Sequence, residues 1–185
     1  YVQRDINKVL DCYFHSANLG FAEAQFNLGV IFYDNLYIKR DIDRSIHFFT
    51  LAANNNHVKA QHMLGIIYFN FIHDINKSIQ YFNLAAKQND AESMYNLACI
   101  FMNGEYVVRD INKAIYYFSL CADQNIPQAF HNLGFIYEGN YIKADIKKSI
   151  DYYLKAANLN YPLSYNSLGN IFYEPKLVNQ DIKKA

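Results

Sequence analysis

The stretch Asn132-Leu133-Gly134-Phe135-Ile136-Tyr137 decides the fold, because variants of it occur five times along the chain. Its leucine recurs at positions 28, 64, 97, 133 and 168, in steps of 36, 33, 36 and 35 residues. A period in this range is typical of proteins built from stacked pairs of helices. The sequence therefore predicts an all-α repeat array, in which each repeat packs on its neighbours.

A second motif recurs in phase with the first and predicts the other helix of each pair. An Asp-Ile dipeptide begins at positions 5, 41, 74, 110, 145 and 181, and apolar residues follow it at helical spacing. An Asp side chain caps a helix by accepting hydrogen bonds from the N–H groups of the first turn. We call this helix the B helix, and the helix with the Leu-Gly stretch the A helix.

Each B helix is expected to end fifteen residues after its Asp. The residues at that place are Gly20, Asn56, Asn89, Asn125 and Asn160. Gly and Asn tolerate the left-handed backbone that closes a helix. A short turn then leads into the next A helix, so the two helices are expected to be antiparallel.

Gly134 and its counterparts at 29, 65 and 169 fall in the middle of the A helices. Gly at such a position costs about 1 kcal/mol relative to Ala. Its recurrence therefore predicts that another helix approaches closely there. Ala98 takes this place in the third copy.

The repeats define the expected domain organisation as one array over residues 1–185. Its parts are a partial repeat 1–20, full repeats 21–56, 57–89, 90–125 and 126–160, and a partial repeat 161–185. Because the array starts and ends within a repeat, we expect it to be a fragment of a longer protein. The uncapped ends would also permit end-to-end self-association.

Composition excludes several classes of partner. The chain has 17 Lys and Arg against 17 Asp and Glu, whereas a nucleic-acid surface needs an excess of positive charge. No apolar run approaches the roughly 18 residues that span a membrane, so no membrane insertion is expected. The three cysteines do not follow the repeat, which indicates reduced thiols and favours the cytoplasm, with no signal peptide in the chain.

No arrangement of residues indicates catalysis, a cofactor or a metal. His62 and His131 occupy equivalent positions two repeats apart, which is too far for one metal ion. The sequence lacks the nucleophile and phosphate-binding motifs of acyl and phosphoryl transfer. We therefore expect a protein that is not an enzyme and needs no cofactor.

The two motifs together resemble the Sel1-like repeat family, relatives of the tetratricopeptide repeats. The residues that fit its pattern in the fourth repeat are Ala129, Leu133, Gly134, Tyr137, Gly139, Asp145, Lys148, Tyr152, Ala156 and Ala157. The resemblance implies a right-handed α-solenoid of antiparallel helix pairs that acts as a scaffold or adaptor. Its partner would be a protein or peptide, held as an extended peptide or a helix in the concave groove.

The resemblance to tetratricopeptide arrays also implies which side chains line that groove. They lie two residues before, two after and five after the leucine of each A helix. The predicted contact residues are Phe26, Tyr33, His62, Phe69, Tyr95, Met102, His131, Phe135, Glu138, Asn166 and Tyr173.

Two rows of this face differ in their expected exposure. The row Phe26, His62, Tyr95 and His131 is expected to be open, whereas the row Val30, Ile66, Cys99 and Phe135 is as easily buried between helices as open. Three alternatives to a peptide-binding scaffold remain. They are a hydrolase like the cysteine-rich bacterial relatives, a spacer within a larger scaffold, and an RNA-reading array, which would need a basic concave face.

Overall fold

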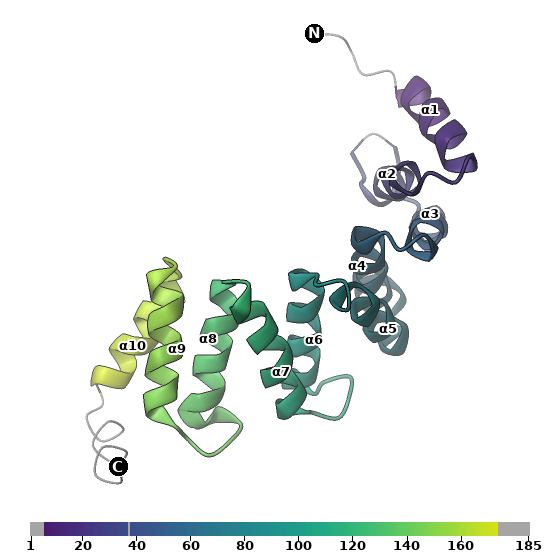
Figure 1. Cartoon of the computed structure of the whole chain (residues 1–185). Helices are drawn as coiled ribbons and strands as arrows, with labels where there is room; N and C mark the ends of the chain where they lie inside the picture. The colour runs from purple at the N-terminus through teal and green to yellow at the C-terminus, as the bar shows by residue number, and fades with distance from the viewer. Residues whose placement is uncertain (1–5, 37, 174–185) are drawn as a thin grey trace. The chain divides into compact units, whose positions relative to one another are not determined.

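The computed structural model describes residues 6–36 and 38–173, and over these ranges the chain is helical and contains no strand (Figure 1). The prediction of an all-α helical repeat solenoid is confirmed. In chain order the elements are α1 (Ile6–Asn18), α2 (Ala22–Tyr33), α3 (Ile42–Asn54), α4 (Val58–Ile67), η1 (Tyr68–Ile72), α5 (Ile75–Ala86), α6 (Ala91–Asn103), α7 (Ile111–Asp123), α8 (Pro127–Phe135), η2 (Ile136–Asn140), α9 (Ile146–Asn158) and α10 (Pro162–Tyr173).

The chain forms two compact units, residues 1–93 and 94–185. In the first unit, α2 packs against α1 and α3, and α4 packs against α3 and α5. In the second unit, α8 packs against α7 and α9, and α9 against α10. The even-numbered α-helices are the predicted A helices, and the odd-numbered ones are the B helices.

The B helices begin where the Asp motif predicted. Before α3, α5, α7 and α9, the Asp carboxylate accepts a hydrogen bond of 3.0 Å from the backbone N–H three residues later. The capping residues are Asp41, Asp74, Asp110 and Asp145. Asp5 and Asp181, for which the same role is predicted, lie outside the described residues.

The predicted left-handed residues after the B helices are confirmed. Gly20, Asn56, Asn89, Asn125 and Asn160 have φ angles between 59° and 87°. Each closes its B helix and directs the chain into the next A helix within a few residues. The turns therefore have one geometry in every repeat.

The mid-helix glycines lie against an aromatic ring of the following B helix. A Cβ atom on Gly29 or Gly65 would come within 2.5 Å of the Phe49 or Phe82 ring, and one on Gly134 within 2.7 Å of the Tyr153 ring. All three rings are at most 2% exposed. The absent side chain is thus what lets the A and B helices of these repeats approach each other.

A hydroxyl group joins the same two helices beside each of these glycines. Ser45, Ser78 and Ser149 donate hydrogen bonds of 2.8–3.0 Å to the carbonyl oxygens of Gly29, Gly65 and Gly134, respectively. The third repeat has Ala98 in place of the glycine, and its B helix has Ala114 in place of the serine. The close contact and the hydrogen bond therefore occur together and are replaced together.

Stacked aromatic pairs join the two helices of each pair about one turn along from this contact. The ring centroids are 5.5–6.2 Å apart and the rings are within 17° of parallel. The basic residue that pairs with the capping Asp lies 4.9–5.3 Å from the A-helix ring of the same pair. The pairs are Phe32–Phe48, Tyr68–Tyr81, Phe101–Tyr117 and Tyr137–Tyr152.

Two of the predicted connections are partly helical, which corrects the sequence interpretation. The short step from Leu64 to Leu97 predicts a shortened loop at Phe69–His73, but residues Tyr68–Ile72 continue the A helix as a π-helical turn. Ile136–Asn140 does the same in the fourth repeat, where Gly139 has a φ of 112°. Such turns insert an extra residue into the helical ladder and are difficult to detect from hydrophobic periodicity.

We expect Gly134→Ala to destabilise the protein by about 1–2 kcal/mol, because overpacking against Tyr153 outweighs the gain in helix propensity. Gly169→Ala is the matched control, since no atom of the described residues lies within 4 Å of the added Cβ. The control is expected to be neutral or stabilising by up to about 1 kcal/mol. Urea unfolding followed by circular dichroism measures both, and equal effects at the two sites would contradict the close approach.

Candidate functional site

The structure places the predicted contact residues in three classes of exposure. His62 and Met102 are buried, at 8% and 9% exposure, while Asn166 and Tyr173 are exposed. The half-buried members are Phe26, Tyr33, Phe69, Tyr95, His131, Phe135 and Glu138. The expectation of an open first row is therefore wrong at His62, and its other members Phe26, Tyr95 and His131 are half-buried. Of the second row, Val30, Ile66, Cys99 and Phe135 are all half-buried.

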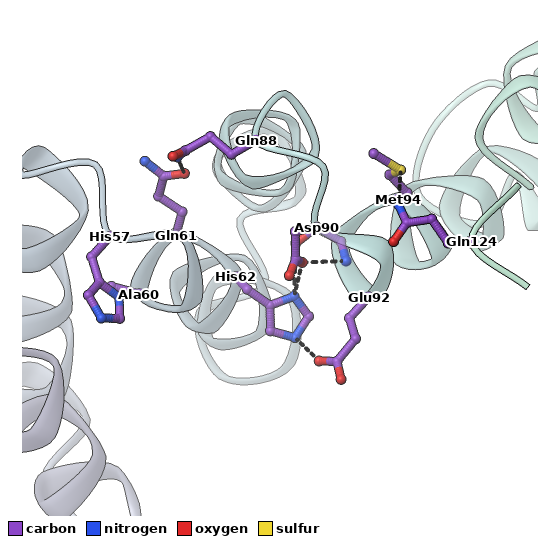
Figure 2. Close-up of polar contacts among 10 residues, drawn as sticks. His57, Ala60, Gln61, His62, Gln88, Asp90, Glu92, Met94 and Gln124 are labelled. Atoms are coloured by element: carbon purple, nitrogen blue, oxygen red, sulfur yellow. Dashed lines mark hydrogen bonds and ion pairs between the residues drawn. The ribbon is translucent and has the colours of Figure 1, made fainter. Parts of the chain in front are cut away.

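His62 is buried because it joins its own A helix, α4, to the first turn of the next one, α6. Its Nδ1 atom lies 2.8 Å from the Ser93 hydroxyl and 3.4 Å from Asp90 Oδ2. Its Nε2 atom lies 3.3 Å from Glu92 Oε2. Figure 2 shows the imidazole directed at the Asp90 and Glu92 carboxylates. Both ring nitrogens thus have partners within the protein.

Asp90 is the strongly perturbed carboxylate of this cluster. Burial raises its pKa, but hydrogen bonds from His62 and from the side chain and backbone of Ser93 together lower it to about 2. The backbone bond, 2.8 Å long, also caps the first turn of α6. The charge of Asp90 is therefore part of the structure at neutral pH.

His131 repeats the contact in the second unit with different neighbours. Its Nδ1 atom lies 3.0 Å from the Ser164 hydroxyl. Its ring packs against Tyr153 and Tyr161, with centroids 5.2 and 5.3 Å away. Burial lowers the pKa of His131, which favours the neutral ring.

The residues of the first row are matched to the residue they meet on the next A helix. Each His is paired with a Ser, as in His62–Ser93 and His131–Ser164. Where the row holds an aromatic residue, Phe26 or Tyr95, the corresponding position is Ala60 or Ala129. The polarity and volume of the row residue thus change together with those of the residue opposite it. This row is therefore largely a packing interface between A helices. Sequence reasoning missed this role, although the His and Ser positions were its visible signal.

The serine and histidine pairs could suggest a nucleophile and its base. Glu92, His62 and Ser93 have the connectivity of an acid, base and hydroxyl group. Ser93 and Ser164 are, however, 0% exposed, so a substrate could not reach either oxygen. The geometry is that of a satisfied buried cluster.

Glu138 also serves an internal contact. Its Oε2 atom accepts a 2.8 Å hydrogen bond from the hydroxyl of Tyr153, which is 0% exposed. The other three full repeats have Phe at the Tyr153 position and no acid at the Glu138 position. Burial and the contact with Glu138 raise the pKa of Tyr153. The carboxylate therefore compensates for a hydroxyl that the fourth repeat, alone among the four full repeats, introduces.

Side-chain amides connect the A helices to the B-helix turns beside them. Gln61 donates to Ala53 O at 3.3 Å, and its oxygen accepts a 2.8 Å hydrogen bond from Gln88 (Figure 2). Gln25 makes the equivalent bonds with Ala17 and Asn55. In the third repeat these amide contacts give way to a 3.9 Å contact from Gln124 to the Met94 sulfur (Figure 2).

The described part of the chain gives little support for a metal site or a membrane-spanning helix. Among residues 6–36 and 38–173, no group of three His, Cys, Asp or Glu side chains is placed to hold a metal ion. Cys12, Cys99 and Cys121 are not joined in a disulfide within these residues, and Cys12 is exposed. Over the same residues, no helix combines the length and apolar character needed to cross a membrane.

The Sel1 repeat model matches four segments, residues 22–57, 58–90, 91–126 and 127–161. These lie one residue beyond the predicted starts and ends of the four full repeats. None of the curated proteins compared with the chain matches it.

Two solved structures are similar over most of the chain. One is a protective antigen present in uropathogenic Escherichia coli strains and displaying an SLR fold, with 25% identity and a TM-score of 0.81 over 88% of this chain and 36% of that chain. The other is a Sel1 repeat protein from Oxalobacter formigenes, with 27% identity and a TM-score of 0.75 over 91% of this chain and 70% of that chain. The chain thus spans about a third of the antigen.

A more distant likeness concerns the fold alone. An immunity protein from Pseudomonas aeruginosa is 18% identical, with a TM-score of 0.53 over 86% of this chain and 75% of that chain.

We expect Asp90→Asn to reduce the loss of stability between pH 4 and pH 2. Because the pKa of Asp90 is lowered from 3.8 to about 2, its stabilisation is complete above pH 4 and is lost as the pH falls through 2. The share of the carboxylate is up to about 2 kcal/mol. Asn retains the ability to cap a helix, so the charge is what changes. Urea unfolding at pH 7, 4 and 2.5, with Asp123→Asn as an exposed control, measures this difference, and identical pH profiles for Asp90→Asn and the parent would refute it.

We expect a double-mutant cycle on His131 and Ser164 to show strong coupling. Ser164→Ala or His131→Phe alone leaves a buried polar group without its partner and should cost about 1–3 kcal/mol. The double variant recreates the aromatic–Ala combination of Phe26 and Ala60, so we expect it to recover at least about 0.5 kcal/mol of the summed losses. Additive losses in urea unfolding would show that the two side chains are independent.

Proposed function

The chain belongs to the Sel1 repeat family, whose members are generally protein-interaction modules, and we propose that it acts as a scaffold that binds a peptide or a helix of a partner protein on its A helices. The family and the related solved structures are typically non-enzymatic repeat scaffolds. The buried Ser93 and Ser164 agree with this function and give no support to a hydrolase.

The observation that carries the proposal is a row of half-exposed apolar side chains on the A helices. Val30 and Ile66 contribute to it in the first unit, and Cys99 and Phe135 in the second. A solvated helix face is normally polar at such positions. A half-exposed apolar residue at the same position of four successive A helices therefore supports contact with a partner.

The chemistry of the row favours a partner with aliphatic or aromatic side chains. Val30 packs against the core of the first unit and leaves part of its surface free, and Phe135 does the same in the second. Tyr, Phe and Met around the row are typical contact residues of protein interfaces. We expect the partner to provide apolar side chains, with its main chain contributing hydrogen bonds.

We expect polar substitutions on this row to abolish peptide binding while the fold is kept. The test is a peptide-display selection on the parent and on Val30→Thr/Ile66→Gln/Cys99→Ser. The control is Leu84→Gln/Tyr116→Thr/Leu154→Gln, which changes three exposed apolar residues of the B helices. Peptides should be enriched on the parent and the control and lost on the A-helix variant, with circular dichroism showing that all three proteins are helical.

Two results would contradict the proposed surface. Enrichment that persists on the A-helix variant would place the contact elsewhere on the protein. No enrichment on the parent would favour a spacer role within a larger scaffold.

A further inference from the structure

Arg40 occupies an unusual position between two aromatic rings at the end of α2. Its Nε atom donates a 2.7 Å hydrogen bond to the Tyr33 carbonyl oxygen. Its guanidinium carbon lies 5.3 Å from the Tyr33 ring centroid and 5.6 Å from that of Phe71. The two rings meet edge to face, with centroids 5.9 Å apart. The guanidinium is therefore held by one hydrogen bond and two rings, which leaves its Nη groups for another partner.

Arg109, 69 residues later in the sequence, has a related but simpler arrangement in the second unit, with one ring in place of two. Arg109 donates a 3.1 Å hydrogen bond from Nη2 to the Asn103 carbonyl oxygen, and its guanidinium carbon lies 5.1 Å from the Tyr141 ring. Like Arg40, it immediately precedes a capping Asp, and its ring comes from the connection of the following repeat. We call each arginine with its aromatic neighbours an arginine bracket.

Neither bracket arginine has an acidic partner among the described residues, in which every ion pair within 4.0 Å involves other groups. The basic residues of the helix caps differ, because Arg44, Lys77, Lys113 and Lys148 all pair with the capping Asp. Within the described residues, the bracket arginines are therefore oriented positive charges without an acidic partner.

The helix pair itself does not require these arginines. The equivalent positions of the second and fourth repeats hold His73 and Ala144, and both repeats keep their capped B helix. A guanidinium stacked on an aromatic ring keeps its planar N–H groups available for a carboxylate. Retention of this geometry in both units, beyond what the fold needs, indicates a ligand.

Exposed apolar side chains accompany each bracket. Leu36 and Ile72 are 71% and 45% exposed in the connections of the first unit. Tyr106 and Val108 are 54% and 91% exposed beside Arg109. An uncompensated cation next to exposed apolar surface is complementary to an acidic residue flanked by apolar ones.

We propose that the two arginine brackets are carboxylate-binding sites for a partner protein segment in which Asp or Glu stands next to aliphatic or aromatic residues. The two arginines lie on the connections between A and B helices, although Tyr33 of the first bracket belongs to α2, one turn after Val30. The proposal rests on the geometry of the arginines and not on the apolar row. One site lies in each unit.

A protein segment fits these sites better than a nucleic acid does. The basic residues at the helix caps near the brackets form ion pairs with the capping Asp carboxylates. The chain as a whole has no excess of positive charge. A nucleic-acid backbone needs a continuous positive track. One oriented guanidinium beside apolar surface instead matches a single carboxylate.

The test is selection of a random 12-residue display library on the parent chain, followed by fluorescence anisotropy with the best enriched peptide. We expect enriched peptides with Asp or Glu beside apolar residues, and about tenfold weaker binding to Arg40→Gln/Arg109→Gln. The matched control Arg44→Gln/Lys113→Gln removes the same charge from paired residues and should change affinity by less than about twofold. Arg40→Lys/Arg109→Lys, which keeps the charge but lacks the planar fork, should bind as weakly as the Gln variant.

Several outcomes would overturn the proposal. They are no enrichment on the parent, enriched peptides without acidic residues, equal losses in the bracket and control variants, and preference for a 12-nucleotide oligouridylate over the peptides. Loss of binding in the bracket variants with full binding in the A-helix variant would support the brackets and contradict the apolar row. Full binding in the bracket variants with loss of binding in the A-helix variant would support the apolar row and contradict the brackets.

Discussion

The close approach of an A helix to the B helix that follows it is the constraint on which the rest of the structure depends. A glycine without a side chain lies against a fully buried ring, and a serine hydroxyl joins the two helices beside it. A larger residue at these glycines would require the ring to move, since an added Cβ would come within 2.5–2.7 Å of a ring atom. The third repeat shows that Ala98 and Ala114 can replace Gly and Ser when both positions change. Because the contact is local to each helix pair, the repeats can vary in their outer surfaces without losing this frame.

Matched side-chain volumes also determine the contacts between successive A helices. The position on the next A helix that corresponds to Phe26 is Ala60. The positions that correspond to His62 and His131 are serines. An aromatic residue fills the space by volume, whereas His shares it with a hydroxyl and gains a hydrogen bond. Asp90 extends this contact in the first unit and carries a lowered pKa as a result. Tyr153 and Glu138 follow the same rule in the second, since the additional hydroxyl is buried together with an acceptor.

The sequence was most informative about what every repeat shares. The capping Asp residues, the left-handed Gly and Asn residues and the mid-helix glycines each have one physical reason, and repetition separates that reason from chance. Prediction of the contact face was weaker, because a position on a helix does not show how much of it the next helix covers. His62 was expected to be open and is 8% exposed, since Ser93 and Asp90 reach it from α6. The π-helical turns were missed because they add one residue without changing the pattern of apolar residues. The arginine brackets were missed because the rings of Phe71 and Tyr141 come from the repeat that follows the arginine.

Several features recur every second repeat rather than in every one. Within residues 6–36 and 38–173, the His–Ser contact, the π-helical turn and the arginine bracket each occur once in each compact unit. Glycine, serine and the capping Asp set the helix pair, whereas these features use residues from two successive repeats. A surface built from two repeats can contain residues that neither repeat could position alone, as Arg40 and Phe71 do. The packing within a helix pair is therefore the same from repeat to repeat, whereas these surface features are built from two successive repeats. Recognition by this protein is for that reason best sought at the junctions between repeats, where the sequence departs from the period of the fold.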